Sequence, residues 1–292
     1  LRLPPSLIQL PAFDLEMTPK TSDALVHAGY VSTRDWLVDG AMADASLAVL
    51  PTRYQARTFP QRWQHKIAVV HEGVPETMLQ LPRLQQLTIA EGVTLGPDVP
   101  VVTFISRNLE PMRGFPTFMR ALPRLLANHS TVQAVIVGGD EVSYSSAPGD
   151  GRSWRDHLLD ELGDRIDRRR GHLFGRIPHD QLQKLYRRSD LHVYLSKAFV
   201  LSWSLLELMA CGTPVLAEAN SMMEELIQPG VNGALWRGQP ESLAQAILTL
   251  LQTPDQLKRW GLQAKQQLQP TYLQHHCLAQ LEQLLQQQAT CF

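Results

Sequence analysis

The chain has 292 residues, of which 27 are Lys or Arg, 28 are Asp or Glu and three are Cys, for a net charge of −1. This length predicts one large or two modest domains, and the neutral balance excludes generic binding to a nucleic-acid backbone. The few Cys exclude a disulfide framework and favour a reducing compartment. No apolar run reaches the ~18 residues of a membrane span, and we expect no secretory signal in the first ten residues.

The first third of the chain has few regular patterns, and we expect irregular structure before residue 45. Ala45–Leu50 and Ile67–His71 are short apolar runs followed by Pro or Gly, which predicts two buried strands. Residues 75–98 are rich in Leu and predict helix in part. They run into the segment Gly96–Pro100, where we place a domain boundary because Pro and Gly are typical of linkers.

From residue 101 onwards, short apolar runs alternate with amphipathic stretches, which predicts alternating strands and helices. The predicted strands are Val101–Ser106, Val132–Val137, His172–Gly175, Leu191–Leu195, Pro214–Ala217 and Gly233–Trp236. The predicted helices are Pro116–Asn128, Trp154–Arg168, Asp180–Arg188, Ser204–Ala210 and Ser221–Gln228. This order predicts an α/β fold with a doubly wound parallel sheet.

Residues 239–290 are rich in Gln and Leu. Their composition also fits low complexity, but the regular Leu spacing favours packed helices that Pro254 and Pro270 interrupt. We therefore divide the chain into three parts, which are residues 1–95, residues 96–253 and residues 254–292.

A doubly wound sheet binds ligands beyond the carboxyl ends of its strands. Arg107 and Arg113 follow the first strand after the linker, beside a predicted helix start, and guanidinium groups there suit phosphate oxygens. A solvated loop with scattered cations is the alternative. Gly138-Gly139 after the next strand would let a ligand approach the backbone, although turn geometry also explains a glycine pair. The missing G-x-G-x-x-G pattern disfavours a nicotinamide dehydrogenase.

Two further loops carry candidate residues. Pro178 holds Ile177 extended, so that the Arg176 plane and a rigid backbone could flank a nucleobase, or simply enter a helix. The backbone N–H groups around Val200–Ser204 open a predicted helix and form a candidate anion site. Glu207, one turn further, suits a pair of ribose hydroxyls. The alternative is a capping box, in which Glu207 returns to the N–H at the helix start.

Residues 100–235 resemble the donor-binding half of retaining GT-B glycosyltransferases of family GT4, the glycosyl transferases group 1. The motifs that carry the resemblance are FVLSWSLLELMACGTPVLAEANSMMEELIQPGVNG at 199–233, Arg107…Arg113-Gly114, Gly138-Gly139, Gly175-Arg176-Ile177 and Ser189-Asp190. Ala43–Arg53 and Lys66–Val74 resemble the end of the family's N-terminal domain and the crossover to the second domain. Both domains of the family together are longer than this chain. The resemblance therefore implies a Rossmann-like donor domain, C-terminal helices and an N-terminal domain that lacks its front.

The resemblance implies a role for each candidate residue, while catalytic residues stay unassigned. The donor diphosphate would be bound by Arg107, Arg113, Val200, Leu201 and Ser202, the ribose by Glu207 and the base by Arg176 and Ile177, with Phe199 on the sugar side. This chain departs from the family at Phe199, where the family has a Glu that contacts the transferred sugar. For His192 and Cys211 we favour structural roles, and for Trp203 we favour packing in the fold over stacking on a sugar. For Glu225 a structural role stands beside a role in the site.

The implied reaction is transfer of a hexosyl group from a nucleotide diphosphate sugar to an acceptor, with retention of configuration and without a metal or other cofactor. The expected partners are the donor and a sugar or lipid-linked acceptor, and not a nucleic acid. We expect a cytoplasmic location, at the inner face of the membrane when the acceptor is lipid-linked. The alternative is a truncated or non-catalytic nucleotide-sugar-binding module, which the missing front and Phe199 motivate.

Overall fold

A computed structural model describes residues 35–89, 92–197, 201–219 and 222–289. Its body is a six-stranded sheet in the order β10-β9-β8-β5-β6-β7, in which all neighbours are parallel. The strands are β5 (Val101–Asn108), β6 (Gln133–Gly139), β7 (Gly171–Phe174), β8 (Leu191–Tyr194), β9 (Val215–Glu218) and β10 (Ala234–Trp236). The predicted doubly wound sheet is confirmed. The strand order reverses at β5, so the ligand crevice of such a sheet lies between the carboxyl ends of β5 and β8.

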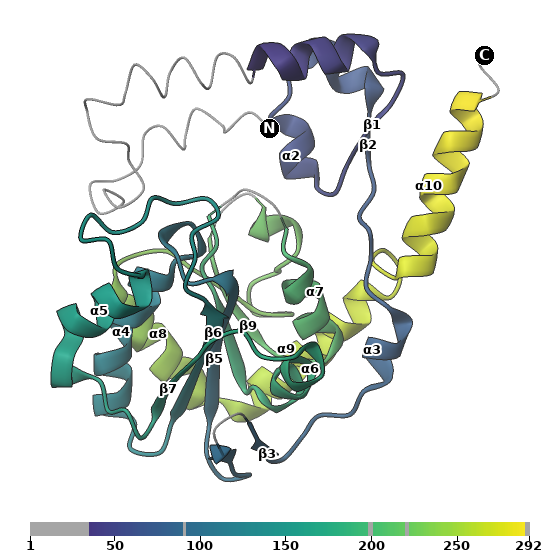
Figure 1. Ribbon diagram of the computed structural model, residues 1–292. Coiled ribbons are helices and arrows are strands. Elements are labelled where there is room, and N and C mark those ends of the chain that lie inside the picture. The colour runs from purple at the N-terminus through teal and green to yellow at the C-terminus, as the bar shows by residue number, and fades with distance from the viewer. Residues whose placement is uncertain (1–34, 90–91, 198–200, 220–221, 290–292) are drawn as a thin grey trace.

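Helices cover both faces of this sheet (Figure 1). One face packs against α4 (Phe115–Asn128), α5 (Trp154–Leu162) and α8 (Pro240–Leu251), the other against α6 (His179–Arg188) and α7 (Trp203–Ala210). Helix α9 (Pro254–Leu268) contributes its first half to the former core and its second half to the latter. Alternate residues of β5 serve the two cores, because strand side chains point to opposite faces in turn. None of the helices within the described ranges combines the length and the apolar character that a bilayer span requires.

The N-terminal part lies against one end of the body (Figure 1). Residues 35–44 are helical, and β1 (Ala48–Leu50) pairs in parallel with β2 (Ile67–Val69) around the short α2 (Arg53–Arg57). The expectation of irregular structure up to residue 45 is therefore wrong for residues 35–44. Gly40 within this helix, a poor helix former, obscures its pattern in the sequence.

Two other expectations need correction. Residues 75–98 contain α3 (Glu76–Gln80) but also β3 (Leu87–Thr88) and β4 (Thr94–Leu95), an antiparallel pair joined near Gly92, whose φ is 76°. The predicted helix Ser221–Gln228 is wrong, since its described residues form only the 3-10 turn η8 (Met223–Glu225). The side chain of Asn232 binds the N–H of Gln228 at 2.7 Å and the carbonyl of Leu226 at 2.8 Å, and so holds this segment in a loop.

The C-terminal helix α10 (Gln274–Ala289) returns to the crossover that leaves β2 (Figure 1). Val74 donates to the carbonyl of Tyr272 at 2.8 Å and accepts from the N–H of Gln274 at 3.0 Å. Gly73 permits this contact, because it has a φ of 79° and a Cβ there would lie 2.6 Å from the Cα of Gln274. The first and last described parts of the chain are thus joined by backbone hydrogen bonds.

Gly212, with a φ of 72°, directly follows Cys211, the C-cap of α7. Gly261, in the middle of α9, packs directly on Gly212, and a Cβ at Gly261 would collide with the Gly212 carbonyl oxygen. The two helices therefore touch through their backbones at this point.

Candidate functional site

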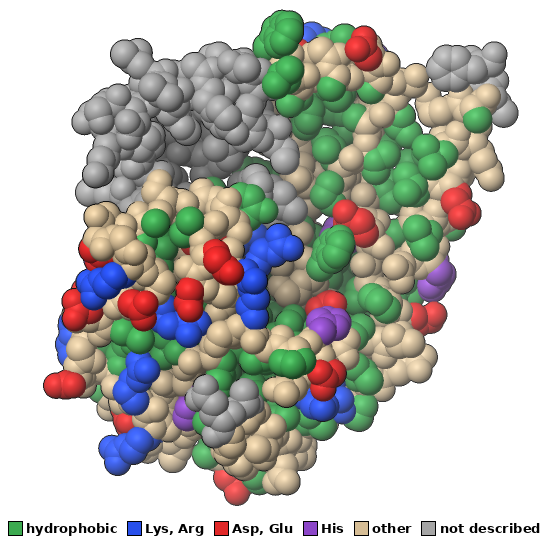
Figure 2. Space-filling view, viewed as in Figure 1, with side chains coloured by type: hydrophobic (Ala, Val, Ile, Leu, Met, Phe, Trp, Pro, Cys, Tyr) green, Lys and Arg blue, Asp and Glu red, His purple; other side chains and the backbone are tan. Residues whose placement is uncertain are grey.

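The candidate residues that the structure describes lie at the carboxyl edge of the sheet, on the loops that follow β5, β6, β7 and β8. On the face shown in Figure 2, Lys and Arg side chains are interspersed with Asp and Glu over the part of the body that holds α4 and α5. Positive and negative charges are mixed in that area, so a phosphate would have to be bound by individual side chains and backbone N–H groups.

The two predicted phosphate ligands lie at the end of β5 and in the loop after it. Arg107 is exposed near the end of the strand, and its side chain has no hydrogen-bond or ion-pair partner among the residues described. The guanidinium of Arg113 lies 3.3 Å from the hydroxyl of Ser196, after β8, and 5.2 Å from the ring centre of Tyr144. Gly114 follows with a φ of 76°, against Leu195, where a Cβ would have no room. Arg113 is therefore placed at the crevice between β5 and β8.

Glu110 in the same loop is a residue that the sequence reasoning missed. It is buried, and its Oε2 accepts the backbone N–H groups of Ser143, Tyr144 and Ser145 at 3.0, 2.9 and 3.0 Å. A carboxylate that accepts three N–H groups ties the loop after β6 to the loop after β5. An acidic residue between two Arg was the signal that could have revealed it.

Arg176 lies beside the end of β6. Its Nη2 donates to Asn108 Oδ1 at 2.9 Å and to Glu141 Oε2 at 2.6 Å. A Cβ at Gly139 would stand 2.6 to 2.8 Å from atoms of these three side chains. The glycine is therefore required by the packing of Arg176, Asn108 and Glu141 against the strand end, and not by a turn conformation. Asn108, which the sequence reasoning also missed, joins the loops that follow β5 and β7.

Glu207 projects from α7 toward α6, with its side chain 20% exposed. Its Oε1 lies 3.3 Å from Nε2 of His179, the first residue of α6. Burial and the charge of Glu207 together raise the pKa of Tyr186, which lies on α6 with His179. The capping box is not formed among the described residues, because the hydroxyl of Ser204 pairs with that of Ser202 at 2.6 Å and Glu207 turns away to His179. The carboxylate thus remains available to a ligand.

The remaining predicted residues are placed as follows. Leu201 is buried, Ser202 is the N-cap of α7, and Ile177 packs on the core beneath α6 and α7. Phe199 and Val200 lie outside the described residues. The expectation that Trp203 packs in the fold is wrong, since its side chain is 65% exposed at the start of α7.

Two residues expected to be structural are buried in the core. Burial raises the pKa of the Cys211 thiol to about 11, which makes it a poor nucleophile. Burial lowers the pKa of His192 to about 3, and its Nδ1 lies 3.0 Å from the hydroxyl of Thr103. Both side chains therefore serve the core, as the sequence predicts.

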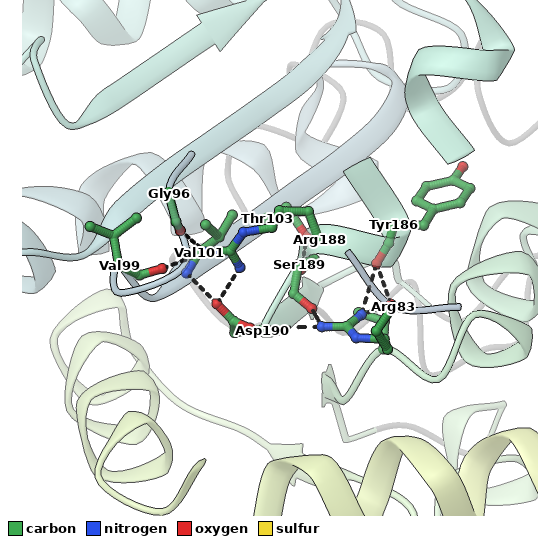
Figure 3. Close-up of polar contacts among 10 residues, drawn as sticks. Arg83, Gly96, Val99, Val101, Thr103, Tyr186, Arg188, Ser189 and Asp190 are labelled. Carbon is green, nitrogen blue, oxygen red and sulfur yellow. Dashed lines mark hydrogen bonds and ion pairs between the residues drawn. The ribbon is translucent and has the colours of Figure 1, made fainter. Parts of the chain in front are cut away.

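The opposite, amino edge of the sheet holds a network of Arg side chains (Figure 3). Arg83 donates to the carbonyl of Tyr186 at 3.0 Å and to the carbonyl of Ser189, while Arg188 donates to Asp190 at 2.7 Å. Asp190 also accepts the N–H of Val101 at 2.9 Å. The Ser189-Asp190 pair is therefore structural: Ser189 binds Arg83, and Asp190 binds the N–H of Val101 at the start of β5.

A cavity of about 660 Å³ lies beside this network, lined by Arg83, Pro100, Asp190, Cys211 and Lys265 among others. It opens at the amino ends of the strands. Ligands of doubly wound sheets bind at the carboxyl ends, so the cavity is not part of the candidate site.

Known proteins resemble the chain in both of its parts. The sequence model of Glycosyl transferases group 1 matches residues 90–267, and that of the Glycosyl transferase family 4 group matches residues 10–79. The D-inositol 3-phosphate glycosyltransferase of Nocardia farcinica is 28% identical over 229 residues, which are 76% of this chain and 49% of that protein. An uncharacterised glycosyltransferase of Methanocaldococcus jannaschii is 27% identical over 187 residues, 63% of this chain and 44% of that protein. The chain thus spans about half the length of the curated relatives it matches.

Solved structures show the same fold. Sucrose-phosphate synthase from Thermosynechococcus elongatus superposes with a TM-score of 0.69 at 21% identity, over 89% of this chain and 63% of that one. HepE of Anabaena, in complex with UDP-glucose, gives a TM-score of 0.63 at 20% identity, over 83% of this chain and 64% of that one. The fold is that of GT-B glycosyltransferases. Because the group 1 model covers more than half of the residues, the chain belongs to the glycosyl transferases group 1 family.

Proposed function

We propose that this chain binds a nucleotide diphosphate sugar at the carboxyl edge of its sheet and serves in transfer of the hexosyl group to an acceptor, with retention of configuration. The observation that carries the proposal is the position of Glu207. It lies one turn inside a helix that starts at the crevice between β5 and β8, and its carboxylate is partly exposed beside His179 of α6. Two vicinal hydroxyls of a ribose are its natural donors.

The diphosphate of the donor would lie next to Glu207. Arg113 reaches Ser196 at the end of β8, and Arg107 is unpaired within the described part of the chain. Helix α7 begins at Ser202 without a side-chain cap, so its first N–H groups are open to an anion. We assign phosphate binding to these groups together with the backbone of Val200 and Leu201.

The base would lie against Arg176 and Ile177, which follow β7. Asn108 and Glu141 hold the Arg176 guanidinium in place, and Pro178 restrains the backbone of Ile177. Phe199 would border the transferred sugar.

In this proposal the chain's contribution to the reaction is electrostatic. Negative charge builds on the diphosphate as the bond to the sugar breaks, and fixed cations and N–H groups stabilise that charge without reorganisation. No step is assigned to a metal ion or another cofactor, so we expect transfer to continue in the presence of EDTA. The acceptor is proposed to be a sugar or a lipid-linked sugar. The buried, unpaired thiols of Cys211 and Cys277 support a cytoplasmic location.

Calorimetric titration with UDP, GDP and ADP tests the proposal, with UDP first because HepE was solved with UDP-glucose. We expect Glu207→Ala to weaken binding about tenfold or more, since hydrogen bonds to a charged group contribute about 1.5–3 kcal/mol. Arg113→Ala should weaken it similarly. Arg169→Ala is the control, because Arg169 is exposed on a turn that precedes β7. Equal affinities in all variants would refute the site.

Turnover separates the enzyme from its alternative. Hydrolysis or transfer of a UDP-sugar by the chain would support the transferase. Tight binding without turnover would instead support a nucleotide-sugar-binding module, a role that fits a chain of about half its relatives' length.

A further inference from the structure

A side chain of α6 contacts the carboxylate of Glu207. His179 approaches it from the solvent side, with its Nε2 3.3 Å from Oε1 and its own side chain 61% exposed. His179 is the first residue of α6, so this contact joins the start of α6 to α7.

The contact is not needed to satisfy His179 itself. The imidazole of His179 is largely hydrated, and Glu207 is its one partner among the described residues. A histidine that is exposed to water can meet its own hydrogen-bonding needs without a carboxylate. The contact therefore matters more for Glu207 than for His179.

Glu207 in turn depends on His179 for its orientation. Its side chain is about four-fifths buried, and its one hydrogen bond to a described residue is the contact with His179. A carboxylate has about four acceptor positions, so one bond to His179 leaves the others for hydroxyl donors. Without His179 the side chain would be free to change rotamer, and part of the binding free energy would be lost as entropy.

We propose that His179 is a positioning residue for ribose recognition, which holds the Glu207 carboxylate toward the donor's hydroxyl pair. This inference rests on the proposed function. It assigns to α6 a part in substrate selection: the helix would give the site its preference for ribonucleotides over deoxyribonucleotides.

The test compares ribonucleotides with deoxyribonucleotides by calorimetric titration of the full chain. The probes are whichever of UDP, GDP and ADP binds best, and its 2′-deoxy and 3′-deoxy counterparts. We expect His179→Ala to weaken ribonucleotide binding about three- to tenfold, as for the loss of one hydrogen bond. Binding of the deoxynucleotide that lacks the Glu207 contact should be unchanged. His179→Gln, which keeps an N–H donor, should recover most of the loss.

His275→Ala is the matched control. His275 is also an exposed histidine beside a carboxylate, Glu76, at 3.8 Å, but it lies on α10. We expect no change in either affinity. If His179→Ala weakens ribonucleotide and deoxynucleotide binding equally, or changes neither, the positioning role is refuted. If the wild-type chain binds none of the three nucleotides, the proposed function itself fails, which is a different result.

Discussion

The Oε2 atom of Glu225 accepts the backbone N–H of Arg53 at 3.0 Å, across 172 positions of sequence. Arg53 opens α2 in the N-terminal part, and Glu225 lies in the turn after β9 of the body. The carboxylate therefore supplies an acceptor for a helix-start N–H that has none within its own helix. A residue whose role the sequence left open between the site and the structure thus joins the two parts of the chain.

Glu225→Ala should lower the free energy of unfolding by about 1 kcal/mol, since it removes one charge-assisted hydrogen bond at a partly solvated position. Glu225→Gln keeps an acceptor oxygen, so its free energy of unfolding should lie between those of Glu225→Ala and the wild type. Urea unfolding measures both. A wild-type midpoint for Glu225→Ala would show that the contact adds nothing to stability.

Arg83→Lys should be nearly as destabilising as Arg83→Met. The guanidinium serves the carbonyls of Tyr186 and Ser189 and the hydroxyl of Thr213, and a single ammonium group cannot reproduce that fork. We expect a loss of about 2–4 kcal/mol in unfolding free energy, from two or three hydrogen bonds. Arg187→Lys is the control, because Arg187 donates to one carbonyl, that of Pro82. Full rescue by Arg83→Lys would contradict the role of the fork.

Glu110→Ala should release the loop after β6. Three backbone N–H groups would lose their acceptor. The side chain of Tyr144 is already exposed, so a less restrained backbone around it should make chymotrypsin cleavage there faster. Mass spectrometry of short digests measures cleavage after Tyr144 directly. Glu161→Ala, which removes a carboxylate that pairs with Arg120 on the surface, should leave this cleavage unchanged. Equal cleavage after Tyr144 in both variants would show that Glu110 does not hold this loop.

Acid should destabilise the fold in part through His192. Burial lowers its pKa from an ordinary 6.5 to about 3, so between these values the unfolded chain binds a proton that the folded chain does not. Stability therefore falls as pH decreases from 6.5 toward 3, by at most about 1.4 kcal/mol per pH unit for one group. Well above pH 6.5, where His192 is neutral in both states, it contributes no slope.

His192→Asn should make this slope shallower when unfolding free energies at pH 7.5 and 5.0 are compared. A residual slope of the same sign is expected, because burial also lowers the pKa of His71 and of His172. His275→Ala, on the surface, should keep the wild-type slope. An unaltered slope in His192→Asn would mean that His192 is not a source of the acid sensitivity.

The body of the fold could be predicted from the sequence because its strands are buried on both faces. Such strands appear in the sequence as continuous apolar runs, as in Val132–Val137, and each run can be located from the local pattern alone. Segments whose shape depends on a distant side chain could not be predicted in this way. The loop that replaces the expected helix Ser221–Gln228 is held by Asn232, and nothing in the local pattern reveals that contact.

The same distinction applies to the candidate site. Arg113 and Glu207 could be placed at one edge from topology alone, since both follow strand ends or helix starts. The partners of these residues could not. The contact of Glu207 with His179 spans 28 positions, and that of Asn108 with Arg176 spans 68. The exposure of a side chain could not be predicted either: we expected Trp203 to pack in the fold, yet it is 65% exposed.

Gly261 illustrates a limit on engineering this protein. A glycine in the middle of a helix is ordinarily an attractive position for thermostabilisation, because alanine there gains up to about 1 kcal/mol of helix propensity. Here the added methyl group would push against the carbonyl of Gly212, at the end of α7. Since α7 is only eight residues long and carries Glu207, its displacement would reach the opposite end, where the donor is proposed to bind. A substitution that improves the local helix would therefore misalign a ligand contact on a different helix.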